Sequence, residues 1–291
     1  MLAAAHLLNG LLMIALPLVL GVVLARRWRL GWGFFGAGAA TFVASQLLHI
    51  PFNYLVLNPF VTERGMFAAG GLAFIAAALL YGLSAGVFEE VARFVVMRRW
   101  TPESRNLPNA LMFGAGHGGS EAIIIGGFAL YGFFQAVALR GADLAQTLPP
   151  EQVDIVAAQM ALYWNMPWYK ALLGAVERAG AICFHLSASA MVLQSVRRGG
   201  WGWLAGAVAW HTLFNAVTLI VMDRWGVYAA EGIVIVGAGI SLLIIFAIKA
   251  MDAPGEDLEA DPPNTPPPNS RVLRIADEDI ADDSLEDSRY A

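Results

Sequence analysis

The chain has 291 residues, of which 58% are hydrophobic and only 14% are charged. Soluble globular domains are about 45–50% apolar and about 25% charged, so this composition excludes a soluble protein and indicates a polytopic membrane protein. The formal net charge is −5, but 12 of the 23 acidic residues lie after residue 250. The remaining body is mildly basic, as the loops of a membrane protein are, and nothing in the charge balance points to a nucleic-acid partner.

Seven stretches are long enough to cross about 30 Å of hydrocarbon as helices. We therefore predict an all-α fold, in which a multi-pass helical bundle occupies residues 1–250 of an integral protein of a bacterial-type plasma membrane. The first stretch lacks a basic leader and a cleavage site, which favours a retained helix over a signal peptide. The seven predicted segments are residues 2–25, 31–53, 66–97, 108–138, 168–196, 201–222 and 231–249.

Basic residues cluster after the first, third and fifth segments, at Arg26–Arg29, Arg98–Arg99 and Arg197–Arg198. Basic loops of membrane proteins face the cytoplasm. The pattern predicts that the N-terminus lies outside and the C-terminus lies in the cytoplasm.

Two regions fall outside the predicted spans. In residues 141–166, apolar side chains recur at helical spacing after Pro149-Pro150, which predicts an interfacial amphipathic helix. Such a helix would be either a surface connector or a lid over a substrate entrance. Residues 251–291 are acidic and proline-rich, and this composition predicts a disordered cytoplasmic tail.

The third segment contains Glu89, Glu90 and Arg93 within an otherwise apolar sequence. A charge at the centre of a membrane helix costs about 2.5–3.5 kcal/mol on insertion scales, so such residues suggest a functional site. With a rise of about 1.5 Å per residue, the two carboxylates lie at the same depth as one histidine on each of three other helices. These histidines are His117, His185 and His211.

Helical spacing gives each of these residues a neighbour on its own face. Arg93 can neutralise one of the two carboxylates and leave the other to act on water. The four-residue spacing favours Glu89 as its partner and Glu90 as the free carboxylate, and both stay candidates for the base. A single intramembrane histidine is often a packing residue, but a histidine with an orienting partner is typical of metal and acid–base sites. The other expected pairs are His117 with Glu121, His185 with Ser189, His211 with Asn215, and Arg178, beside Glu177, with His185.

Other patterns narrow the chemistry. The sequence contains no H-E-x-x-H motif. A G-x-S-x-G match at Gly82–Gly86 lies inside a predicted helix, without the strand-to-helix turn that gives this motif its meaning. Cys183 is the only cysteine, which excludes a disulfide framework or a cysteine-rich metal site. The glycines of residues 114–119 favour either close helix packing or room for a substrate.

The ordered set of motifs resembles the YhfC family of intramembrane metalloproteases. That family is similar to the type II CAAX-prenyl endopeptidases (CPBP proteins), to the PrsW proteases and to a scaffold subunit of gamma-secretase. The resemblance covers roughly residues 1–250. Its motifs are Glu89-Glu90-x-x-Arg93, Phe113-x-x-x-His117 with Gly118-Gly119-x-Glu121, Glu177-Arg178 before His185, and His211-x-x-x-Asn215.

The resemblance implies that Glu89 or Glu90, together with His117, activates water for peptide-bond cleavage. It also implies that His211 and Asn215 stabilise the oxyanion, and it leaves open whether His117 or Glu121 is the catalytic residue of the second motif. Zn²⁺ would be held by histidines of the polar layer, unless a buried glutamate acts without metal. The candidate ligands are His117, His185 and His211.

These inferences predict an intramembrane endopeptidase whose partners are the lipid bilayer and a membrane protein or peptide substrate. Hydrolysis needs an activated water, a proton acceptor and donors for the oxyanion, and the polar layer offers all three. A non-catalytic scaffold or chaperone subunit would use the same polar cluster for assembly. An ion-coupled transporter is less favoured, because the sequence shows no inverted repeat.

Overall fold

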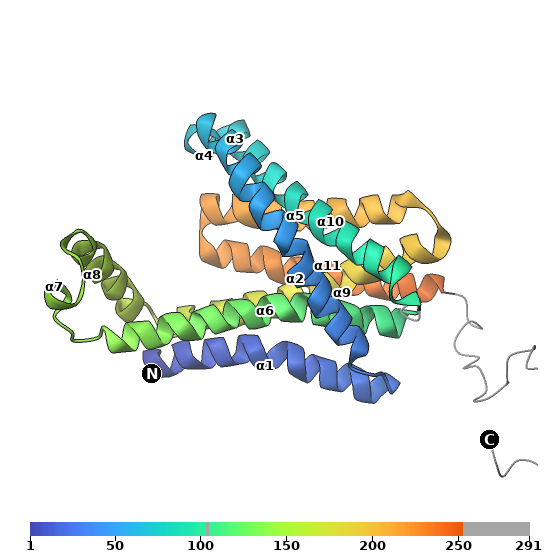
Figure 1. Ribbon diagram of the computed structural model, residues 1–291, viewed down its shortest axis with the longest axis horizontal. Coiled ribbons are helices and arrows are strands. Elements are labelled where there is room, and N and C mark those ends of the chain that lie inside the picture. Colours follow the sequence, from blue (N-terminus) through green and yellow to red (C-terminus); the bar gives the residue numbers. More distant parts are fainter. Residues whose placement is uncertain (103–104, 253–291) are drawn as a thin grey trace, which may run out of the picture. The chain divides into compact units, whose positions relative to one another are not determined.

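A computed structural model describes residues 1–102 and 105–252, and the predicted tail lies outside these residues except for its first two positions. Seven helices of the described chain are long and apolar enough to cross a membrane (Figure 1). This confirms the prediction of an all-helical polytopic bundle. The long helices are α1 (Leu2–Trp28), α2 (Gly33–Phe52), α5 (Gly71–Arg99), α6 (Leu107–Ala138), α9 (Leu173–Arg198), α10 (Trp201–Trp225) and α11 (Val227–Met251).

The second and third spans differ from the predicted boundaries. After α2 the chain continues through a π-helical turn (Asn53–Leu57) into α3 (Asn58–Glu63), so this span is longer than predicted. A short helix, α4 (Met66–Ala69), then ends at Gly70 and Gly71, whose φ angles are 65° and 53°. Because only glycine adopts positive φ readily, these two residues separate α4 from α5. The third span therefore begins at Gly71 and not at residue 66.

The connection between α6 and α9 contains α7 (Leu144–Thr147) and α8 (Pro150–Asn165). A helix after the proline pair was predicted here, and α8 confirms that the segment is helical. The ring of His6 on α1 stacks on Tyr163 of α8, with 3.9 Å between ring centroids, and one of its nitrogens lies 3.4 Å from the Tyr163 carbonyl. His6 therefore joins α1 to the connection.

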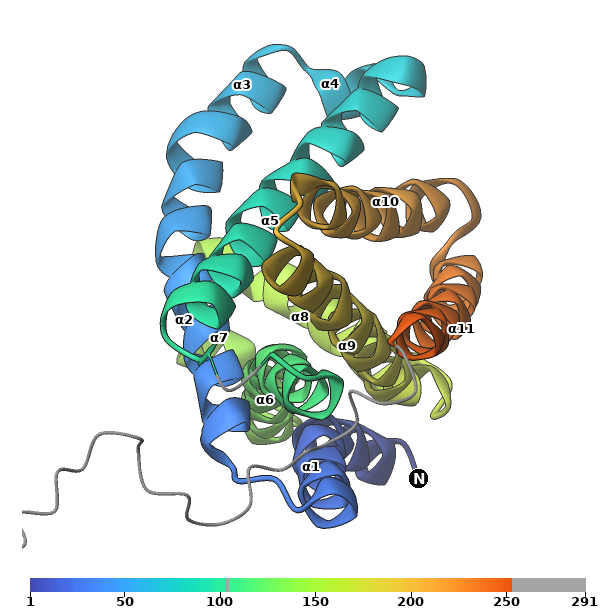
Figure 2. The same cartoon turned by 90° about the vertical axis from the view of Figure 1, so that its right-hand side faces the viewer.

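Helix α9 lies at the centre of the bundle (Figure 2), where α5, α6, α10 and α11 surround it. Most of its residues from Ala175 to Ser195 are buried. Some of them are polar, including Arg178 and His185. A helix enclosed on every side can bury polar groups only if its neighbours supply hydrogen-bond partners. The helices around α9 must therefore carry side chains that hydrogen-bond to its buried polar residues.

Glycines allow α6 to approach its neighbours closely. A Cβ atom on Gly116 would collide with the Phe35 carbonyl oxygen of α2. Cβ atoms on Gly114 and Gly118 would come within 2.8 and 2.6 Å of atoms of His185 on α9. Small residues permit such contacts between membrane helices. The glycines around the buried histidine of α6 therefore serve packing, as one of the two predicted alternatives held.

Candidate active site

The predicted polar layer forms where α5, α6, α9 and α10 meet. The ring centroids of His117 and His185 are 5.3 Å apart, and those of His185 and His211 are 6.0 Å apart. The three histidines are at most 4% exposed. Histidines that are distant in sequence, and that were predicted at one depth, thus lie close together.

Glu90 contacts one residue of its own helix, Arg93, and one residue of α10, His211. Arg93 Nη1 lies 2.8 and 3.1 Å from the two oxygens of Glu90, and His211 Nδ1 lies 2.9 Å from Oε1. Glu90 and Arg93 have no exposed surface. The expected pairing of Arg93 with Glu89 is wrong. Residues three apart also share a helix face, so Arg93 can reach Glu90 as well, and His211 of α10 contacts the same carboxyl group.

Glu89 turns towards α2 and α6. Its Oε1 accepts a hydrogen bond from Gln46 Nε2 at 3.1 Å, and its Oε2 lies 3.2 Å from His117 Nε2. Glu89 is 6% exposed and lines a cavity. Glu89, rather than Glu90, is therefore the carboxylate of this pair that can meet a substrate.

The ring of His185 has a defined tautomer. Arg93 Nη2 lies 3.1 Å from His185 Nδ1, and a guanidinium has donors only. His185 Nδ1 must accept, so the neutral ring carries its proton on Nε2 and donates it to Glu121 Oε2 at 2.9 Å. Arg178 Nη1 in turn donates to Glu121 at 2.7 Å and pairs with Glu177 through Nη2. Hydrogen bonds thus run without interruption from Glu177 on α9 through Glu121, His185 and Arg93 to Glu90 on α5.

The predicted pairs within single helices are therefore mostly replaced by pairs between helices. Glu121 bonds to two residues of α9. Ser189 Oγ is buried without a hydrogen-bond partner among the described residues. The expected link between Arg178 and His185 is present, but it passes through Glu121. Asn215 on α10 faces the same cavity as His211.

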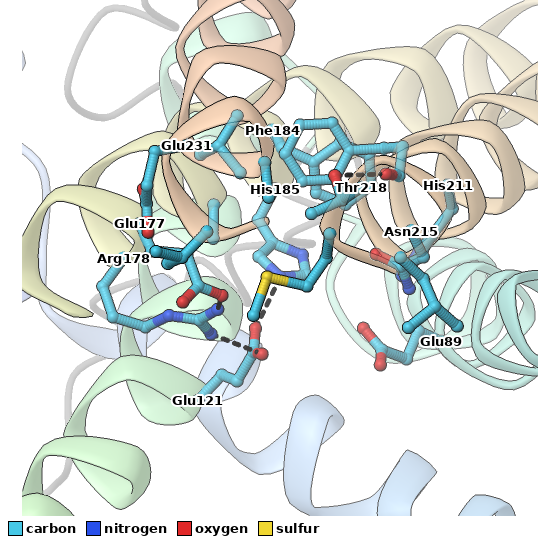
Figure 3. A pocket seen from close by; sticks show the side chains of 17 residues that line it. Glu89, Glu121, Glu177, Arg178, Phe184, His185, His211, Asn215, Thr218 and Glu231 are labelled. Carbon is cyan, nitrogen blue, oxygen red and sulfur yellow. Dashed lines mark hydrogen bonds and ion pairs between the residues drawn. The ribbon is translucent and has the colours of Figure 1, made fainter. Parts of the chain in front are cut away.

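A cavity of about 370 Å³ opens beside the polar layer, between α9, α10 and α11 (Figure 3). In this view Glu89, His211 and Asn215 lie on one side, and the acidic residues of the other helices lie opposite. None of its lining residues comes from α8, which favours the connector over the lid. The lining includes Glu121, Glu177, Arg178, Phe184, His185, Phe214 and Glu231.

Three residues of the layer fit a metal ion by type and position. One ligand atom each from Glu89, His117 and His185 lies within 4.8 Å of the other two. Two imidazoles and a carboxylate are the donors of many catalytic zinc sites. His117 Nδ1 is buried without a partner among the described residues, whereas both nitrogens of His185 are already hydrogen-bonded. An ion would therefore replace one bond of His185. The predicted ligand His211 lies outside this group.

Two residues of the site were missed by the sequence analysis. Gln46 bonds to Glu89 and also contacts His49 Nδ1 through its Oε1 at 3.2 Å. Its polar character in the middle of an apolar segment was the available signal. Glu231 was placed at the edge of the seventh segment, but α11 begins at Val227, so Glu231 lies inside the helix and on the cavity wall.

The comparisons with known proteins agree with this geometry. A family model described as YhfC intramembrane metalloprotease matches residues 12–237. The uncharacterized membrane protein YhfC of Bacillus subtilis (strain 168) is 31% identical over 256 residues, which cover 84% of this chain and 94% of that relative. No solved structure matches the chain. The protein is an integral multi-pass membrane protein, and it belongs to the YhfC intramembrane metalloprotease family.

Proposed function

We propose that this protein is an intramembrane endopeptidase that hydrolyses a peptide bond of a membrane protein or peptide, with Glu89 as the proton acceptor. The observation that carries the proposal is the position of Glu89, which contacts His117 and also lines the cavity. Glu90 is unsuited to this role because Arg93 and His211 occupy its oxygens and it has no exposed surface.

Glu89, His117 and His185 would hold the metal ion that the family name implies. Zinc in a site of this kind lowers the pKa of a bound water to about 7. A carboxylate has two oxygens, so Glu89 can bind an ion through one and accept a proton through the other.

The proton balance closes on Glu89. Its carboxylate takes one proton from the attacking water while the hydroxide oxygen bonds to the carbonyl carbon of the substrate. When the carbon–nitrogen bond breaks, the same carboxyl group returns the proton to the leaving nitrogen. Gln46, whose Nε2 donates to Oε1 of Glu89, keeps the carboxylate oriented during both transfers.

Asn215 and His211 would act on the oxyanion. The Asn215 side chain offers N–H donors to the cavity. His211 Nδ1 lies 2.9 Å from Glu90 Oε1, and Arg93 Nη1 lies 2.8 Å from the other oxygen of the same carboxyl group. His211 would donate to the oxyanion from Nε2 as an imidazolium, with a proton taken from solvent before turnover and kept through it, and Glu90 would stabilise that imidazolium as the buried aspartate of a serine-protease triad does.

The proposal can be tested with purified protein reconstituted in lipid nanodiscs and fluorogenic single-span peptides. Glu89→Gln should lower kcat by about 100-fold or more, since general acid–base groups contribute factors of this size. His117→Ala should have a similar effect. Glu63→Gln, on the exposed α3, is the control and should match the wild type. Wild-type rates in Glu89→Gln would refute the assignment.

A further inference from the structure

Glu231 is a buried acid that the proposed reaction does not use. It lies in the second turn of α11, is 9% exposed and lines the cavity. Its Oε2 atom is buried and has no hydrogen-bond partner among the described residues. A buried carboxylate normally has a partner, because desolvation without compensation is expensive. The cavity therefore contains a buried acceptor with which a bound ligand can pair.

The charges of the cavity wall point to the kind of partner. Four of its lining residues are carboxylic acids, namely Glu89, Glu121, Glu177 and Glu231, whereas Arg178 is the one lysine or arginine among them. Arg178 is shared between Glu121 and Glu177. Glu89 has partners of its own on α2 and α6. Within residues 1–102 and 105–252, Glu231 is thus left without a cation, and a cationic ligand would restore the balance.

The rest of the wall is suited to an aliphatic stem. Leu219 and Met222 of α10 and Val227 and Val234 of α11 line the same cavity. Lysine and arginine side chains bury their methylene stems against such surfaces and place the charged group on an acid. A small uncharged polar group would use neither the apolar wall nor the unpaired carboxylate.

We propose that Glu231 forms a subsite for a cationic group on an aliphatic stem of the substrate, either a lysine or arginine side chain or a free amino terminus. This inference rests on the proposed function and adds the substrate class to it. In Figure 3, Glu231 and Glu89 lie on opposite sides of the cavity, so one bound chain can meet both.

The first test compares peptides that differ only in charge. Single-span peptides with acetylated ends carry Lys, Gln or Met at each position near the cleaved bond, and a second set keeps a free amino terminus. We expect the wild type to prefer one cationic peptide by at least about tenfold in kcat/KM, as losing a buried ion pair implies. The set that shows the preference tells a side chain from an amino terminus.

Glu231→Gln should remove this preference while cleavage of the neutral peptide stays within about twofold, because the amide keeps the shape and loses the charge. Glu231→Asp keeps the charge and should retain part of the preference. Glu63→Gln, on exposed α3, is the matched control and should retain all of it. A preference unchanged in Glu231→Gln, or absent in the wild type, would overturn the proposal.

A second test separates this inference from the proposed chemistry. Binding of the fluorescent peptides is measured in Glu89→Gln and in Glu89→Gln/Glu231→Gln, which differ only at the subsite. Tighter binding of the cationic peptide in the first variant and equal binding in the second support the subsite even if no variant cleaves. Cleavage by the wild type with equal binding of all peptides supports the enzyme and refutes the subsite. Thermal unfolding curves confirm that the variants are folded.

Discussion

Arg93 Nη1 lies within 3.1 Å of both carboxylate oxygens of Glu90, and Arg93 Nη2 lies 3.1 Å from Nδ1 of His185 on α9. One fully buried guanidinium therefore balances the charge of Glu90 and fixes the tautomer of His185. This arrangement leads to a direct prediction about stability.

Arg93→Met should destabilise the protein by about 3–5 kcal/mol, because removing one partner of a buried pair leaves an uncompensated charge. Adding Glu90→Gln to Arg93→Met should recover part of the loss. The measurement is thermal or denaturant unfolding in detergent. Arg99→Met, at the exposed end of the same helix, serves as the control. Equal stability of Arg93→Met and Arg99→Met would contradict the role given to the buried pair.

Gln46 is expected to position Glu89 without touching the substrate. Gln46→Leu removes the hydrogen bond to Oε1 and should lower kcat about 10- to 100-fold, the range seen for groups that orient a reactive residue, while KM changes little. Gln135→Leu, an exposed change on α6, is the control. A loss confined to KM would mean that Gln46 contacts the substrate.

Metal content gives a separate readout of the histidine cluster. Elemental analysis of the purified wild type should find about one equivalent of zinc or a similar ion, and His117→Ala and Glu89→Gln should lose it. His6→Ala changes a buried histidine that lies on the connection to α8, and it should retain the ion. Retention in His117→Ala would exclude this cluster as the binding site.

The glycines of α6 predict opposite effects of one substitution. Gly116→Ala places a methyl group against the Phe35 carbonyl and should cost about 1–3 kcal/mol, as overpacking does. Gly127→Ala meets open space, and alanine is the better helix former by about 1 kcal/mol. It should be neutral or stabilising. Unfolding curves of the two variants decide, and similar curves would contradict the close approach.

The orientation in the membrane also remains a prediction. In a Cys183→Ala background, a cysteine at Gly200 should react only with membrane-permeant reagents in intact cells, because it adjoins Arg197–Arg198. Ala142 follows the C-terminal end of α6, on the side predicted to face the outside. A cysteine there should react with impermeant reagents. The reverse pattern would invert the topology.

Much of the fold could be predicted from the sequence because an apolar stretch of sufficient length can satisfy its backbone in a bilayer only as a helix. The boundary at Gly70-Gly71 was missed because glycines do not interrupt hydrophobicity. The depth of Glu89, Glu90 and the three histidines was predictable, since helical rise is constant.

The partner of each of these side chains was not predictable in the same way. Positions three and four residues away share a helix face, so the sequence could not decide whether Arg93 pairs with Glu90 or Glu89. That choice depends on His211, which comes from another helix. Gln46 and Glu231 were overlooked for a related reason. Gln46 matters because it bonds to Glu89 on another helix, and Glu231 matters because it lines a cavity formed by several helices.

The hydrogen bonds of α5 have a consequence for how the chain enters the membrane. Helices are synthesised in order, and the histidines that complete the site follow α5 in the sequence. Glu90, however, has Arg93 within its own helix, and Glu89 has Gln46 on α2, which is made earlier. The most charged span therefore needs no later helix to meet its first partners. The site can be finished afterwards, as α6, α9 and α10 arrive.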